Sequence, residues 1–210
     1  METDRLIALF VRGQKDAEEL EKKKELWAAA DPKRRISYSL EELKAGVQRG
    51  EMYLYTLKLC FEAKKIFGGK LTVPFIRDCF DVMEEVEDHE LWVSQKRKTS
   101  FLTACAPSGE PGDFETWVGQ VKTGMELSGL QLKNLQIQSA GSIDYMSYET
   151  ASAEGLVYNL QFRFWKEGLL CVGLWNCMAE EKMGWGLLQE AMLHVMEEMN
   201  FPEGGLYGNG

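Results

Sequence analysis

The sequence predicts an α+β protein: three N-terminal helices, then a helix, a four-stranded antiparallel meander sheet and a C-terminal helix packed on the sheet. Two observations carry this prediction. Apolar residues occupy every second position from Leu156 to Phe164, which is the period of a strand with one face on a core. From Met183 to Met199, apolar residues recur instead at helical spacing, up to Asn200. Together they indicate an antiparallel sheet covered by the last helix.

The N-terminal part of the chain shows helical spacing. An amphipathic pattern from Leu6 to Leu20 predicts a first helix, and Asp31-Pro32 ends it because proline restricts the residue before it. Ser39 and Glu42 have the spacing of a capping box, which predicts the start of a second helix. That helix is expected to end at Gly68-Gly69, and its apolar face consists of Leu43, Val47, Leu54, Leu57, Phe61 and Ile66.

A third helix and a linker follow. Thr72 is the expected N-cap, with Pro74 in the first turn and an inner face that runs from Ile76 to Leu91. The segment Pro107–Asp113 contains two prolines and two glycines, which neither a helix nor a central strand accommodates. The sequence therefore predicts a helical region over 1–106, a linker over 107–113 and an α+β domain over 114–210. Whether the two regions pack as one domain stays open.

The C-terminal half is expected to hold one helix and four strands before the last helix. Apolar residues from Phe114 to Met125 favour a short helix that Gly129 closes. The alternation over 131–138 slips in phase, which predicts a bulge near Lys133-Asn134. A tyrosine-rich strand over 143–150 follows, and the polar break Lys166-Glu167-Gly168 joins the last two strands as a hairpin.

Composition and cysteine spacing indicate a cytoplasmic protein. With 210 residues, of which 45% are hydrophobic and 11% aromatic, the chain can bury a core without disulfides or metals. No apolar run approaches the ~18 residues of a membrane span, and the acidic N-terminus does not resemble a signal peptide. The five cysteines form no C-x-x-C pair, so we expect free, buried thiols.

Charge restricts the class of partner. The chain has 24 Lys and Arg residues against 33 Asp and Glu residues, a formal net charge of −9. A field of this sign repels phosphate backbones and favours a basic protein partner over nucleic acid. Neither a membrane partner nor an oligomeric state is indicated.

The sequence gives little support for an enzyme. Its two histidines each have a glutamate four residues away, as the pairs Glu85/His89 and His194/Glu198. Neither pair has the Glu-x-x-His spacing of helical di-metal centres, so no metal site is predicted. A nucleophile elbow and a phosphate-binding loop are also missing, and the segment 184–186 is expected to allow close helix-to-sheet packing. No cofactor is expected.

Aromatic residues on the predicted strands suggest a binding surface. Tyr145, Tyr148, Trp165 and Trp175 are the candidates for a partner or ligand surface, unless helices cover both faces of the sheet. The leading hypothesis is a non-enzymatic cytoplasmic interaction protein, an adaptor or inhibitor-like module with an acidic, aromatic-bearing surface. The alternative is a small-ligand-binding domain with an apolar pocket between the sheet and the helices.

Overall fold

The computed structural model describes residues 37–109 and 112–202, and from Tyr38 onward they belong to one compact unit. In these ranges the chain forms three helices and two antiparallel sheets. The predicted first helix over Leu6 to Leu20 lies outside the described residues. No helix in the described ranges is long and apolar enough to cross a membrane.

A short helix and a small sheet begin the described part. Helix α2 (Leu40–Arg49) starts at Ser39, whose side chain and that of Glu42 form the predicted capping box. Gly50 ends the helix in the left-handed conformation, at φ 84°, which favours glycine. Strands β1 (Glu51–Leu54), β2 (Leu57–Ile66) and β3 (Leu71–Ile76) then pair in the order β1-β2-β3.

The second sheet has seven strands in the order β4-β5-β6-β10-β9-β8-β7. Its members are β4 (Val82–Glu85), β5 (His89–Ser94), β6 (Thr99–Pro107), β7 (Lys133–Ala140), β8 (Ile143–Ser152), β9 (Gly155–Lys166) and β10 (Leu169–Met178). Strand β6 pairs with β10 across 66 residues of sequence, at Cys105 and Cys171 for example. This pairing joins the strands before the Pro/Gly segment to the meander after it.

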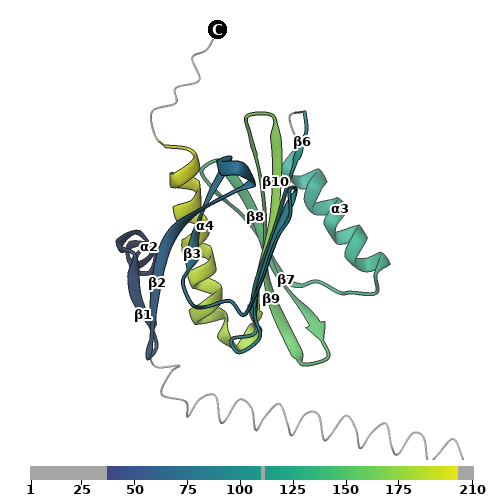
Figure 1. The fold of residues 1–210 in the computed structure, drawn as a ribbon. Coiled ribbons are helices and arrows are strands. Elements are labelled where there is room, and N and C mark those ends of the chain that lie inside the picture. The colour runs from purple at the N-terminus through teal and green to yellow at the C-terminus, as the bar shows by residue number, and fades with distance from the viewer. Residues whose placement is uncertain (1–36, 110–111, 203–210) are drawn as a thin grey trace, which may run out of the picture. The chain divides into compact units, whose positions relative to one another are not determined.

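Helices lie on both faces of the seven-stranded sheet (Figure 1). Helix α4 (Leu187–Asn200) and the small sheet pack on one face, here called the inner face, where Leu188, Met192 and Phe162 belong to the main core. Helix α3 (Phe114–Leu127) packs on the opposite, outer face through Val118, Met146 and Tyr148. A π-helical turn over Lys182–Gly186 leads into α4, and its two glycines meet Tyr55 and Tyr158 closely, as the predicted close packing requires.

The prediction of three N-terminal helices is wrong. Residues 51–106 belong to the region expected to be helical but form six strands, the last of which ends at Pro107, and the main sheet has seven strands in place of four. In β2, Leu57, Leu59 and Phe61 alternate with exposed Lys58, half-buried Cys60 and exposed Glu62. Leu54, Leu57 and Phe61 also fit a helical face. The local pattern was therefore ambiguous. Pro74, expected in a helical first turn, lies in β3, an edge strand, where a missing N–H is tolerated.

The meander itself is present within the larger sheet. Strands β7 to β10 are antiparallel neighbours, and the register of β7 against β8 shifts between Lys133 and Gln136, where the bulge was predicted. Glu167 and Gly168 both have positive φ and join β9 to β10 in a two-residue turn. Phe162 is fully buried on the inner face, as the alternation predicts.

Candidate functional site

The four aromatic residues proposed as a surface do not lie together. Tyr145 and Trp175 are buried in the main core on the inner face, and Tyr148 is buried under α3 on the outer face. Trp165 is 37% exposed, and its indole Nε1 donates a hydrogen bond to the carbonyl oxygen of Ser108 at 3.2 Å. Of the four rings, only that of Trp165 is accessible to a partner in this structure.

The two buried tyrosines act as hydrogen-bond donors. Burial raises the pKa of Tyr148 to about 12, and its hydroxyl donates to Oε1 of Gln161 at 2.9 Å. Burial, and then a hydrogen bond to Glu190, raises the pKa of Tyr145 well above its usual value. Both hydroxyls therefore stay protonated near neutral pH. The hydroxyl of Tyr145 joins the sheet to α4, and that of Tyr148 joins β8 to β9.

The histidine–glutamate pairs lie apart. Glu85 and His89 are on adjacent strands, and Glu85 binds Lys64 on the inner-face side while His89 contacts Glu84 and Asp88. Glu198 forms an ion pair with Lys44 of α2 at 2.6 Å. Among the described residues there is no group of three or more His, Cys, Asp and Glu side chains suited to a metal ion.

Helix α3 covers the β8–β9 half of the outer face. Arg163 of β9 is almost fully buried there, with its guanidinium 5.3 Å from the ring of Phe114 and 5.4 Å from that of Trp117. Its Nη2 lies 3.5 Å from a carboxylate oxygen of Asp144. These cation–π contacts attach the first turn of α3 to a polar part of the sheet.

The other half of the outer face, from β10 to β4, carries apolar side chains that remain accessible. Paired residues of antiparallel strands share a face, so Leu174, Leu102 and Leu91 form one continuous row. Leu102 is 41% exposed, and Val82, opposite Val93, is 43% exposed. The residues of this open face are Val82, Leu91, Val93, Leu102, Ala104, Leu170, Val172 and Leu174. Exposed apolar patches of this kind are typical of interaction sites.

An acidic hairpin forms the edge of the open face. Strand β4 and the turn after it carry Glu84, Glu85, Glu87 and Asp88, and Asp81 directly precedes β4; all five are exposed. Glu84 pairs with Leu91 and so points to the open face, while Glu85 pairs with Glu90 and points to the other side. The hairpin therefore places carboxylates on both of its faces.

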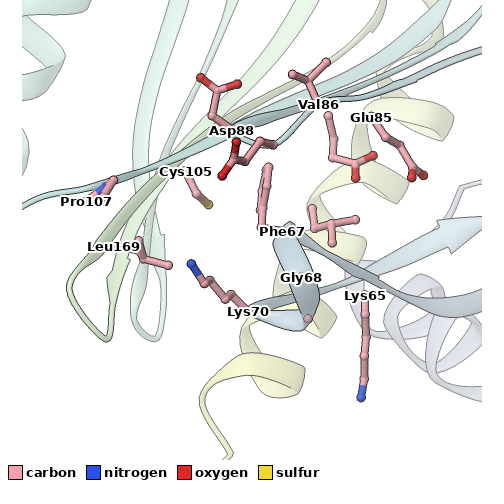
Figure 2. A pocket seen from close by; sticks show the side chains of 14 residues that line it. Lys65, Phe67, Gly68, Lys70, Glu85, Val86, Asp88, Cys105, Pro107 and Leu169 are labelled. Carbon is pink, nitrogen blue, oxygen red and sulfur yellow. The ribbon is translucent and has the colours of Figure 1, made fainter.

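A cleft of about 630 Å³ lies on the inner side of this hairpin, between the β2–β3 turn and the ends of β6 and β10 (Figure 2). Its apolar walls come from Ile66, Phe67, Val86, Pro107 and Leu169. Lys70 extends along the cleft, whereas the side chain of Lys65 points away from the hairpin (Figure 2). This volume is within the range of small-molecule sites.

A buried ion pair fixes one wall of the cleft. Glu90 is 4% exposed, accepts a hydrogen bond from the indole Nε1 of Trp92 at 3.0 Å and lies 3.6 Å from Nζ of Lys64. Lys64 also binds Glu85 and lies 5.0 Å from the ring of Trp92. Because Lys64 belongs to β2, these contacts hold the acidic hairpin against the small sheet and leave Glu87 and Asp88 as the carboxylates at the mouth.

A disulfide joins Cys105 of β6 to Cys171 of β10, next to the cleft. The prediction that all five cysteines are free is therefore wrong. The two residues are directly opposed in the sheet, with Cα atoms 4.2 Å apart. Cys60, Cys79 and Cys177 are free thiols, and Cys171 and Cys177 both lie on the inner face. Only the β6–β10 register reveals the disulfide, and sequence spacing carries no signal for that register.

Comparisons with known proteins do not assign this chain to a family. No protein-family model and no curated protein sequence matches it. A crystal structure of a Pseudomonas aeruginosa protein of unknown function aligns with 67% of this chain and 94% of its own, at 9% identity and a TM-score of 0.37. The solution structure of cyanobacterial PsbP from Synechocystis aligns with 66% of this chain and 88% of its own, at 11% identity and a TM-score of 0.43. Similarities this low support no inference about function.

Proposed function

We propose that this chain is a non-enzymatic cytoplasmic interaction protein that binds a protein partner on the open face of its seven-stranded sheet. The observation that carries the proposal is the row of accessible leucines on β10, β6 and β5, beside exposed carboxylates at the sheet edge. A binding surface of this type combines an apolar centre with a polar rim.

Charge specifies the chemistry of the partner. Glu84 points to the open face from its edge, and Glu87 and Asp88 follow it in the same hairpin. An apolar segment flanked by lysine or arginine would bury the leucines and face these carboxylates. Salt shortens the Debye length and so screens the attraction between exposed charges. Complex formation should therefore weaken as the salt concentration rises from roughly 0.05 M to 0.5 M.

The test compares capture of a partner from the source cell by full-length variants. Leu102→Asp places a charge in the centre of the open face and should abolish capture, while Glu84→Lys should reduce it. Leu127→Asp is the matched control, because Leu127 is an 85% exposed leucine at the end of α3, away from the sheet. All variants should keep the unfolding midpoint of the wild type.

Two outcomes contradict the proposal. A partner that is captured equally well by Leu102→Asp and by wild type does not bind the open face. If Glu84→Lys captures the partner more strongly than wild type does, the partner's binding surface is not basic. That result excludes electrostatic attraction to the carboxylates as a part of the proposal.

A second candidate function is the binding of a small ligand in the cleft, and the volume of the cleft favours it. Lys70 on one wall and Glu87 and Asp88 on the other would suit a zwitterionic ligand, such as an amino acid or dipeptide.

Val86 and Val82 are equally exposed valines of one hairpin, at 44% and 43%, but only Val86 lines the cleft. In ligand-observed NMR with a panel of dipeptides, Val86→Trp should abolish binding and Val82→Trp should preserve it. Equal effects of the two substitutions exclude the cleft.

A further inference from the structure

The disulfide has one accessible and one buried end. Cys105 is half-buried and lines the cleft, whereas Cys171 is 3% exposed and belongs to the main core. A molecule in the cleft can therefore reach the sulfur of Cys105 but not that of Cys171. Accessible disulfides are the labile ones in proteins, and in the cytoplasm disulfides are usually transient.

We propose that the Cys105–Cys171 disulfide is a thiol-exchange site at which a small, carboxylate-bearing thiol forms a mixed disulfide with Cys105. The thiol loses its proton to solvent, and its thiolate attacks Sγ of Cys105. The bond between Cys105 and Cys171 breaks, a bond between the small thiol and Cys105 forms, and Cys171 leaves as a thiolate that takes up a proton. The number of disulfide bonds does not change, so the step needs no oxidant.

The cleft supplies the selectivity for a carboxylate. Lys70 lines the same cleft as Cys105, and its side chain extends toward Leu169 (Figure 2). Its ammonium group attracts the carboxylate of an incoming thiol, while Glu87 and Asp88, which line the same cleft, attract an ammonium group, so the thiol that fits carries both groups, as glutathione does. Two other cysteines are poor competitors, because burial raises the pKa of Cys79 to about 11 and that of Cys177 to about 12, so both stay protonated near neutral pH.

Cys105 is connected directly to the acidic hairpin through the backbone. The backbone N–H of Cys105 donates a hydrogen bond to the carbonyl oxygen of Asp88 at 3.1 Å, so the hairpin turn is attached to the exchanging residue. The inference goes beyond the proposed function, since it requires no protein partner and its test does not involve one.

The experiment uses the full-length chain with Cys60→Ser, which removes the half-buried free thiol. The oxidised protein is incubated with reduced glutathione, quenched with acid and analysed by intact mass and peptide mapping. We expect one glutathione on Cys105 and a free thiol at Cys171. In variants that keep only one of the two disulfide cysteines and are treated with oxidised glutathione, Cys105 in Cys171→Ser should react roughly tenfold or more faster than Cys171 in Cys105→Ser, and the difference should vanish in urea.

The carboxylate preference has its own matched control. Lys70→Gln should slow the reaction with glutathione severalfold but not that with β-mercaptoethanol, which has no carboxylate. Lys65→Gln removes a lysine whose side chain points away from the hairpin and should leave both reactions unchanged. Where a serine variant fails to fold, the order of alkylation of the reduced protein, with Cys105 before Cys171, is the readout. A glutathione adduct on Cys171, an adduct formed only in urea, or equal alkylation rates overturn the proposal.

Discussion

Replacing Gly173 by alanine should destabilise the protein by placing a methyl group inside the ring of Phe162. Gly173 on β10 is directly opposite Phe162 on β9. A Cβ at position 173 would lie 2.2 Å from Cζ of that ring and 2.6 Å from Cε1. The ring cannot easily move, because Phe162 is fully buried and nearly parallel to the rings of Phe101 and Phe164, each 6.3 Å away.

The size of the effect follows from overpacking. An extra methyl group in a packed core costs about 1–3 kcal/mol, so we expect Gly173→Ala to lower the free energy of unfolding by that amount. Phe162→Ala alone should cost about 3–5 kcal/mol through lost burial and a cavity. Once the ring is gone, alanine is better than glycine in a strand by roughly 0.5–1 kcal/mol. The two substitutions should therefore be coupled by about 1.5–4 kcal/mol.

The assay is a double-mutant cycle by urea denaturation, followed by tryptophan fluorescence and by far-UV circular dichroism. Coincident transitions for the two probes justify a two-state treatment. If the costs of Gly173→Ala and Phe162→Ala simply add, the ring does not cover Gly173 and the register of β9 against β10 is incorrect. A stabilising effect of Gly173→Ala in the wild-type background leads to the same conclusion.

Three further predictions concern hydrogen bonds, an ion pair and the packing of α4. Gln161→Ala should cost about 1–3 kcal/mol in urea denaturation, since it leaves the buried Tyr148 hydroxyl without its partner, and adding Tyr148→Phe should restore most of the loss. Glu198→Gln should cost about 0.2–1 kcal/mol at neutral pH. The ion pair with Lys44 lowers the pKa of Glu198 from 4.5, so this cost should be full above that pH and disappear as the pH falls through the lower pKa of the folded protein. Leu188→Ala and Met192→Ala in the buried face of α4 should each cost about 2–5 kcal/mol, and a cost below that of an exposed substitution would contradict the packing of α4 on the sheet.

Several elements could be predicted because their signals are local. The capping box of Ser39 and Glu42 satisfies backbone groups within one turn, so it forms wherever a helix starts there. The alternation of β9 and the turn at Glu167-Gly168 likewise involve residues close in sequence. These segments produced a correct hairpin, meander and last helix.

Elements whose partners are distant could not be predicted. Strand β6 becomes a central strand only because β10, more than 60 residues later, supplies its hydrogen bonds. The segment over 51–76 fits both a helical and a strand period, and the left-handed Gly50 together with sheet pairing selects the strand. The helix therefore ends at Gly50, and not at Gly68-Gly69, because the residues after Gly50 pair into a sheet.

For the candidate sites too, some features could be predicted from local sequence and others depend on the packing of distant elements. The sequence by itself determined that the chain is acidic, that Phe162 faces a core and that a helix follows the meander. Tertiary structure decided that Tyr145, Tyr148 and Trp175 are buried, because helices pack on both faces of the sheet and α3 covers the β8–β9 half of the outer face. It also decided that Leu102 is accessible and that Cys105 meets Cys171 beside the cleft. The physical reason is that alternation within a strand fixes which side chains share a face, whereas only the packing of distant elements determines which face is covered.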